Sequence, residues 1–313
     1  MENKKSKSNF AKMVEANWRL YVLMAPLMIW LFLFAYKPMG GLVIAFQDYN
    51  LFRGISGSDW IGFDNFKELF SGSGSMYFWR AFNNTIAISM YSLIFTFPLP
   101  IILALFFNEV KDGLFRRGVQ TIMFLPHFLS EVILAGIVVS FLQPETGIIN
   151  IFLMKLGILD EGIYFLMQPE WFRPVYILAG VWKEVGFSSI VYFAALSAIS
   201  PEQYEAARVD GATKLQQMRF VSLPGIGPTI ITMFIIKIGN LLSVGFERVI
   251  LLYQPVTYDT ADVLSTYIYR LGLTGSSDFS MAAAAGLFNS VIGFVLVIAA
   301  NTISKKLSDT VLW

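Results

Sequence analysis

Six long apolar segments dominate this sequence and limit the folds that it can adopt. A helix needs about 20 consecutive, mostly apolar residues to cross the hydrocarbon core of a membrane. Segments of roughly that length recur along the whole chain, at residues 20–36, 81–107, 119–142, 174–198, 225–253 and 282–303. The chain is 56% hydrophobic and only 14% charged. The pattern predicts an all-α integral membrane protein with six transmembrane helices.

The first apolar segment follows several lysines, so a secretory signal peptide is the alternative to a retained span. Its end, residues 34–38, reads Phe-Ala-Tyr-Lys-Pro and lacks a small-residue cleavage site. We therefore expect the segment to be retained. The predicted organisation is an N-terminal segment of residues 1–19, a transmembrane domain of residues 20–303 and a C-terminal tail of residues 304–313.

Lysine and arginine are unevenly distributed between the connections, which predicts the orientation of the chain. One set of connections is rich in basic residues: Lys4, Lys5, Lys7, Lys12, Arg19, Lys111, Arg116, Arg117, Arg208, Lys214, Arg219, Lys305 and Lys306. The other set is poorer in them: Arg53, Lys67, Arg80, Lys155, Arg173 and Arg270. Cytoplasmic flanks carry the basic excess. Both termini are therefore expected in the cytoplasm.

The sequence offers no chemistry of its own for catalysis. It contains no Walker-type glycine-lysine loop, no HExxH and no GxSxG arrangement, and it has no cysteine. The net charge is +1 and the basic residues occur in short clusters, so nucleic acid is not an expected partner. We expect a chain that is not an enzyme and that binds no metal or cofactor.

The connection of residues 200–224 has strong local signals. Ser200 suits a helix N-cap and Pro201 the first helical position, while Asp210-Gly211 supplies a residue that can adopt a left-handed turn. A second short helix is expected from Thr213 to Val221. The product is a helix-turn-helix elbow that projects from the membrane.

Such an elbow could fit a groove of a soluble motor protein and move with it as a unit. Ala206 and Ala207 are small enough for close approach, and Glu205 and Arg208 can fix the orientation by polar contacts. The alternative is an amphipathic loop that lies on the lipid headgroups. The residues alone leave both open.

Motifs along the chain resemble a known family. Glu205-Ala206-Ala207, then Gly211, then Leu223-Pro224 match the EAA loop of the permeases of binding-protein-dependent ABC importers. The chain resembles the maltose-type sugar permeases in particular, on Trp182, Ala194-Ala195-Leu196, Gly62-Phe63-Asp64-Asn65-Phe66 and Asn83-Asn84-Thr85. Four further stretches resemble the sequences of a subfamily that handles oligosaccharides such as alginate or pectin fragments: residues 38–41, 45–49, 265–273 and 312–313.

The resemblance implies a type I ABC importer permease fold in a bacterial inner membrane. It implies a second permease subunit as partner, two ATPase subunits that hold ATP and Mg²⁺, and an extracytoplasmic sugar-binding protein. ATPase coupling would fall to Glu205, Ala206, Ala207, Arg208, Asp210 and Gly211.

Charged residues inside the apolar segments are costly and need a reason to be there. Lys183, Glu184, Lys237, Glu247 and Arg248 are such residues. They either line the path of a sugar or pair between subunits, and Glu247 and Arg248 are favoured for the path. Asn240 and Tyr253 are added as candidate sugar contacts, because amide and phenol groups can serve hydroxyls.

The single histidine suggests a rival function. His127 lies four residues before Glu131, and on one helix face the two could form a proton relay of a secondary transporter. The alternative is that polar groups here satisfy carbonyls freed by Pro126. Trp30, Trp79, Trp171 and Trp182 could stack on sugars, but tryptophan also gathers at membrane interfaces.

Overall fold

The computed structural model describes residues 2–274 and 277–307. In this part of the chain, four helices are long and apolar enough to cross a membrane, and two bent helix pairs raise the number to six. The four are Ala16–Phe46, Ser75–Glu109, Pro169–Ser197 and Phe279–Ile303. The bent pairs are Leu114–Phe128 with Glu131–Phe141, and Lys214–Gly225 with Gly227–Gly239. The six predicted spans are therefore present.

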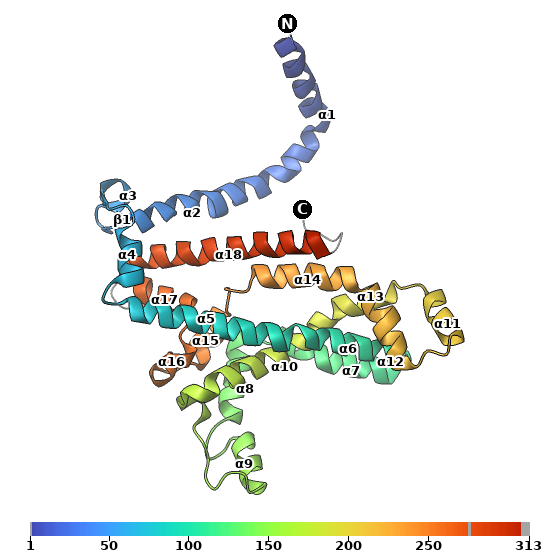
Figure 1. Cartoon of the computed structure of the whole chain (residues 1–313). Coiled ribbons are helices and arrows are strands. Elements are labelled where there is room, and N and C mark those ends of the chain that lie inside the picture. Colours follow the sequence, from blue (N-terminus) through green and yellow to red (C-terminus); the bar gives the residue numbers. More distant parts are fainter. Residues whose placement is uncertain (1, 275–276, 308–313) are drawn as a thin grey trace.

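The first span stands apart from the other five. It is built from α1 (Glu2–Leu31), η1 (Phe32–Tyr36), α2 (Lys37–Met39) and η2 (Gly40–Phe46), with a kink at Asn17. Figure 1 shows α1 leaving the bundle, and only its η2 end packs on α18 (Phe279–Leu307). None of the most apolar stretch of Ala16–Phe46 is buried.

The sixth span, α18, packs on η2 and on the fifth span, whereas the second, third and fifth spans pack on α10 (Pro169–Ser197). Helix α10 contacts α5 (Ser75–Thr96), α6 (Pro98–Glu109), α7 (Leu114–Phe124), α8 (Glu131–Phe141), α14 (Gly227–Gly239) and α15 (Phe246–Leu252). Helices α5 and α6 together form the second span. The sixth, α18, continues to Leu307, past the predicted boundary at 303. The predicted motif at 312–313 lies outside the described residues.

Two predicted spans are broken, which corrects the expectation of continuous helices. After α7 the chain forms η3 (Leu125–Phe128), becomes extended, and starts α8 at Glu131 with a bend of 103°. In the fifth span, α13 (Leu223–Gly225) meets α14 at a bend of 62°, and a turn at residues 240–245 then separates α14 from α15. Hydropathy does not reveal these breaks because the residues that flank them are apolar.

The connection between the first two spans forms a small folded unit at one end of the bundle. It contains β1 (Gln47–Asp48), α3 (Gly54–Gly57), β2 (Asp59–Trp60) and α4 (Asp64–Ser71). The strands pair antiparallel, with Gln47 opposite Trp60. Asn65 donates from Nδ2 to the carbonyls of Ala45 and Gln47, both at 3.0 Å. This unit is short, because the residues up to Phe46 belong to the first span and those from Ser75 onward belong to the second.

Two further connections lie near the same end. The first contains α9 (Ile148–Lys155) and η4 (Phe165–Met167), and the second η6 (Pro255–Thr257), α16 (Tyr258–Ala261), α17 (Leu264–Tyr269) and η7 (Arg270–Thr274). Asn150 organises the first, because its buried amide donates to the carbonyls of Leu142, Gln143 and Ile163 at 3.0–3.1 Å. In the second, burial favours a lower pKa for Arg270, but the hydrogen bonds that Arg270 donates to Asp262, and the charge of that carboxylate, raise the pKa above the ordinary value.

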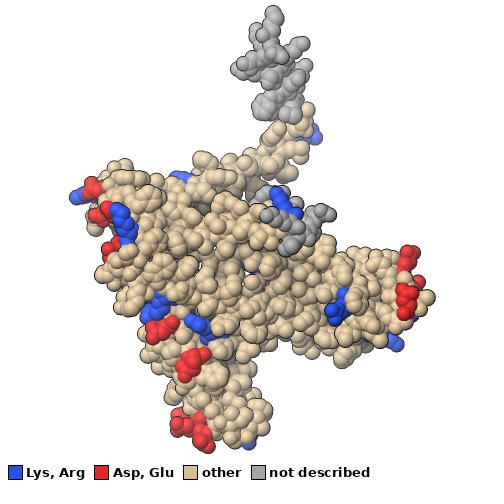
Figure 2. Space-filling view, viewed as in Figure 1, with Lys and Arg blue, Asp and Glu red and all other residues tan. Residues whose placement is uncertain are grey.

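Helix α11 (Pro201–Val209) and helix α12 (Lys214–Gln217) form the opposite end (Figure 1). On the face shown in Figure 2, charged side chains gather at the ends of the molecule and on the lower projection, and the middle is almost free of them. Such an uncharged band suits a lipid environment.

Candidate functional site

The elbow of residues 200–225 is a compact motif whose turn is defined by backbone hydrogen bonds. Gly211 has a φ of 79°, and the amide of Ala212 donates to the carbonyl of Ala207 at 2.9 Å. The Gly211 amide donates to the carbonyl of Arg208 at 3.1 Å, which completes a Schellman motif at the end of α11. The predicted left-handed turn is therefore confirmed. The predicted cap is only half correct, because Ser200 occupies the N-cap position without a side-chain hydrogen bond.

The second arm of the elbow is fixed by a capping box. The Thr213 hydroxyl accepts from the amide of Gln216, whose side-chain oxygen accepts from the Thr213 amide at 2.7 Å. Helix α12 then continues as a π-helical turn, η5 (Met218–Ser222), and as α13, so the predicted second helix is present but irregular.

Three contacts join the elbow to the bundle or close it on itself. The Tyr204 hydroxyl lies 2.9 Å from the hydroxyl of Ser222, and Gln217 donates to the carbonyl of Ala212 at 2.8 Å. Lys214 forms an ion pair of 2.7 Å with Glu109, the last residue of α6. The elbow is thereby connected to two spans, through α6 and through α13.

The tip of the elbow is apolar as well as charged. Glu205, Ala206, Arg208, Asp210 and Gly211 are exposed and Ala207 is half-buried. The Glu205–Arg208 pair at 3.8 Å is open to solvent and contributes little stability. Val209, at the end of α11, is 87% exposed, and Leu215, in α12, is 75% exposed. The sequence analysis missed these two, although an apolar residue in each arm of a polar loop was the available signal.

A second candidate site lies inside the bundle, where Glu131 joins three spans. Its carboxylate accepts from Nζ of Lys183 at 2.7 Å, and from Nε and Nη2 of Arg248 at 3.0 and 2.9 Å. Glu131 is the first residue of α8, Lys183 lies in α10 and Arg248 lies in α15. Lys183 and Arg248 thus pair within this chain. Gly180 leaves the room for Arg248, since a Cβ there would lie 2.6 Å from Nη1.

His127 and Glu131 do not form the proton relay of the rival hypothesis. The chain becomes extended after η3, so the two residues do not share a helix. His127 instead places Nδ1 3.2 Å from Glu184 and stacks its ring on Phe187 at 3.9 Å. The Glu131 carboxylate accepts its hydrogen bonds from Lys183 and Arg248. The structure therefore gives no proton relay between these residues.

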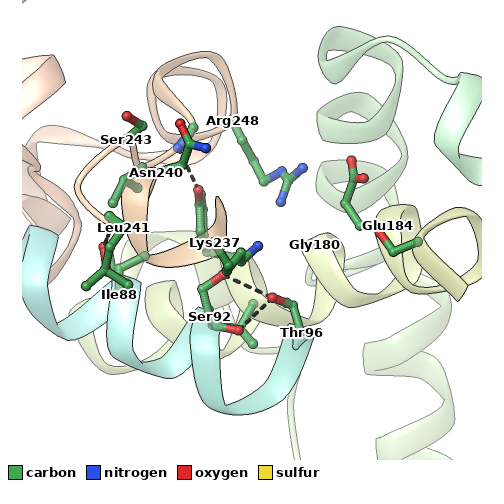
Figure 3. A pocket seen from close by; sticks show the side chains of 16 residues that line it. Ile88, Ser92, Thr96, Gly180, Glu184, Lys237, Asn240, Leu241, Ser243 and Arg248 are labelled. Atoms are coloured by element: carbon green, nitrogen blue, oxygen red, sulfur yellow. Dashed lines mark hydrogen bonds between the residues drawn. The ribbon is translucent and has the colours of Figure 1, made fainter. Parts of the chain in front are cut away.

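A cavity of about 280 Å³ opens beside this network (Figure 3). Side chains from α5, α10, α14, α15 and the turn at 240–245 line it. Of the predicted path residues, Glu184, Asn240 and Arg248 line the cavity, as does Lys237. Non-helical backbone at membrane depth is tolerated where it lines such a cavity, which accounts for the break in the fifth span.

The cavity has a hydroxyl-bearing wall that the sequence analysis missed. Ser89, Ser92 and Thr96 line it from α5, and Ser188 lines it from α10. The spacing of the three α5 residues, three and then four positions, places them on one face and was readable in the sequence. Ser89 donates to the carbonyl of Leu241, and the Tyr176 hydroxyl accepts from the Gly245 amide at 3.1 Å. These two bonds hold the turn in place.

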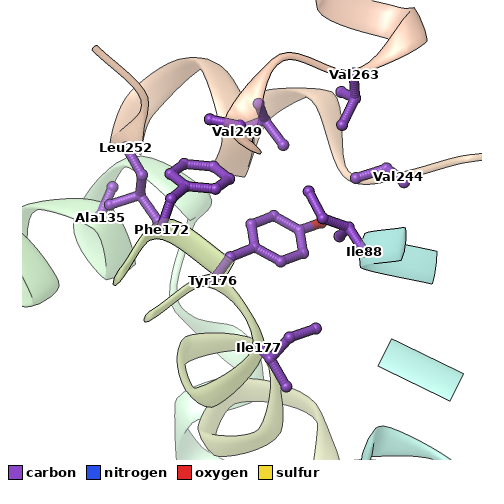
Figure 4. Packing of buried hydrophobic residues seen from close by; sticks show 10 residues of the cluster. Ile88, Ala135, Phe172, Tyr176, Ile177, Val244, Val249, Leu252 and Val263 are labelled. Atoms are coloured by element: carbon purple, nitrogen blue, oxygen red, sulfur yellow. The ribbon is translucent and has the colours of Figure 1, made fainter. Parts of the chain in front are cut away.

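A buried apolar cluster supports the cavity from behind. It includes Phe172, Tyr176, Val249, Leu252 and Val263, which come from α10, α15 and the start of α17 (Figure 4). Arg248 lies over the Tyr176 ring, with 5.4 Å between its guanidinium carbon and the ring centroid. The cluster therefore fixes the helix that carries Arg248.

Three predicted path residues do not reach the cavity. Lys183 is buried behind it against Glu131. Glu247 is exposed on another side of α15 from Arg248, because adjacent helical residues point about 100° apart. Tyr253 stacks on Tyr258 at 4.9 Å, beyond the end of α15.

Comparison with known proteins identifies the family. Residues 96–309 match the family described as binding-protein-dependent transport system inner membrane component. The chain belongs to this family. It is therefore a multi-pass permease component of an ABC transporter, and a proton-coupled secondary transporter has no support.

Relatives with names and structures are similar over almost the whole chain. The polygalacturonan/rhamnogalacturonan transport system permease protein YteP of Bacillus subtilis is 41% identical over 98% of this chain and 94% of its own length. A solved bacterial ABC transporter involved in the import of the acidic polysaccharide alginate matches with a TM-score of 0.88 and 49% identity, over 95% of this chain and 99% of the other. A bacterial alginate ABC transporter in complex with alginate pentasaccharide-bound periplasmic protein also matches, with a TM-score of 0.88 and 50% identity, over 96% and 99%. The type I importer permease fold is thus confirmed.

Proposed function

We propose that this chain is the permease subunit of an ATP-driven importer whose cargo is an oligosaccharide. The observation that carries the proposal is the hydroxyl-lined cavity at the break in the fifth span, in a chain whose relatives transport polysaccharide fragments. Hydroxyl and amide groups such as Ser92, Thr96 and Asn240 can exchange hydrogen bonds with sugar hydroxyls.

The same proposal assigns the partners. A second permease subunit covers the unburied first span, and the two chains enclose the path between them. Two ATPase subunits bind the elbows, with Val209 and Leu215 in their grooves, and hold the ATP and Mg²⁺. An extracytoplasmic binding protein delivers the sugar, as the periplasmic protein of the solved alginate complex suggests. Both termini and the elbow then lie in the cytoplasm.

The contacts of the elbow suggest how ATP drives transport. When the ATPases close, each elbow moves as a unit because its turn and cap are hydrogen-bonded. The Lys214–Glu109 ion pair passes this motion to α6 and hence to the α5 wall of the cavity. The continuous chain from α12 through α13 passes it to α14, which carries Lys237. Motion of the elbow thus moves two helices that line the cavity, α5 and α14, as alternating access requires.

Purification of the tagged chain from its native host tests the proposal. The expected preparation contains a second permease and an ATPase, and its ATP hydrolysis rises when an oligosaccharide-loaded binding protein is added. ATP-dependent uptake into proteoliposomes should follow. A chain that purifies alone, or a complex that takes up no oligosaccharide, contradicts the proposal.

A further inference from the structure

The charged groups around the cavity do not balance. Glu131 is shared by Lys183 and Arg248, and Glu184 is paired with His127. Lys237 lines the cavity and forms no ion pair with any of the described residues. Three cations, Lys183, Lys237 and Arg248, thus face two carboxylates, Glu131 and Glu184, which leaves an excess of one positive charge among these groups.

Of the three cations, Lys237 is the one best placed to bind a negatively charged ligand. It is exposed to the cavity, whereas Lys183 is buried and Arg248 is bound by two hydrogen bonds to Glu131. It lies in the last turn of α14, where the negative end of the helix dipole favours a positive charge. An ammonium kept inside a transmembrane bundle marks a substrate or ion pathway by default.

The surroundings of Lys237 define what could neutralise it. A second cavity of about 410 Å³ adjoins the first, and the two share Thr96, Ser188, Lys237 and Asn240. Lys237 therefore lines both cavities, together with two hydroxyl-bearing residues and one amide residue. A ligand that fits carries one negative charge and several hydroxyl groups. A sugar ring that bears a carboxylate has this composition.

We propose that Lys237 binds the carboxylate of an acidic saccharide, so that the permease itself selects uronate-containing oligosaccharides. This inference rests on the proposed function, and it names the class of cargo and the residue that recognises it. Glu184 contributes by repelling a carboxylate from its own side of the cavity, which directs the acid group to the α14 wall. The sugar hydroxyls then face Ser92, Thr96 and Ser188.

The test compares one oligosaccharide with and without its charge. The complete complex, with its ATPases and binding protein, is reconstituted in proteoliposomes. Uptake of a trigalacturonate is compared with uptake of its methyl ester, which has the same length without the carboxylates. The variants are Lys237→Gln and Lys237→Arg, and the control is Lys111→Gln, which removes an exposed lysine between α6 and α7.

A charge-assisted hydrogen bond supports an effect of about tenfold or more. Lys237→Gln is expected to lower trigalacturonate uptake by that factor and to leave uptake of the ester unchanged. Lys237→Arg and Lys111→Gln should keep the wild-type preference. Equal losses for both sugars, or no loss, overturn the inference. Loss of the second permease subunit from Lys237→Gln but not from Lys237→Arg also overturns it, because Lys237 would then pair across the subunit interface. A wild-type complex that transports neither sugar, nor any other oligosaccharide, contradicts the proposed function itself.

Discussion

Replacing Glu131 with glutamine tests the central feature of the bundle. The Glu131→Gln variant keeps the size of the side chain and one acceptor oxygen but removes the negative charge. It leaves Lys183 and Arg248, whose side chains are 9% and 12% exposed, without a counter-charge. Because Glu131 joins α8 to both α10 and α15 through charged groups, the loss should loosen all three helices.

The expected cost is large. Three hydrogen bonds of 2.7–3.0 Å join the carboxylate to two buried cations. Breaking a buried pair by removing one partner costs about 3 to 5 kcal/mol. For a chain of this size that corresponds to a fall of about 5 °C or more in the unfolding midpoint. The assay is the fraction of intact complex that remains after heating in detergent.

Two further variants make the result decisive. Asp59→Asn breaks an exposed pair with Arg53 at 3.5 Å and should cost about 0 to 1 kcal/mol. Adding Lys183→Met to Glu131→Gln removes one stranded charge and should recover part of the lost stability. The reasoning is refuted if Glu131→Gln is as stable as Asp59→Asn. It is also refuted if Lys183→Met lowers the stability of the Glu131→Gln variant by the same amount as it lowers the stability of the wild type.

Three other predictions concern the elbow and the topology. Gly211→Val should uncouple ATP hydrolysis from uptake, because a φ of 79° costs a β-branched residue about 1 kcal/mol or more, while Gly211→Asn should retain coupling. Wild-type uptake by the valine variant would contradict this. Val209→Asp or Leu215→Asp should reduce the amount of ATPase that co-purifies and leave the permease folded, since both side chains are exposed; unchanged recovery would exclude them from the interface. Single cysteines at Ser73 and Lys214 should react with an impermeant thiol reagent from opposite sides, and the chain has no native cysteine to interfere.

The sequence was sufficient for features that depend on neighbouring residues. Six apolar segments predicted six spans, because burial in lipid requires a fixed length of apolar helix whatever its neighbours are. The elbow was predicted in the same way. A proline at the helix start and a glycine in the left-handed region act within a few residues, so Pro201 and Gly211 shape the backbone locally.

The site inside the bundle was predicted only in part. Charges in apolar segments are conspicuous in a sequence, so Lys183 and Arg248 were singled out, but Glu131 was considered only as a partner of His127. The sequence could not show that these three meet, since Glu131 meets partners that are 52 and 117 residues away along the chain. The breaks at residues 129–130 and 240–245 were hidden because flanking apolar residues mask them.

The contrast between Glu247 and Arg248 shows what the tertiary structure decided. The two are adjacent, both are charged, and the sequence favours both equally for the path. The packing of α15 against Phe172 and Tyr176 fixes the rotation of that helix. That rotation turns Arg248 toward Glu131 and the cavity and leaves Glu247 exposed. Local propensities set which segments are helical, but only the packing of one helix on another sets which of its sides faces the cavity.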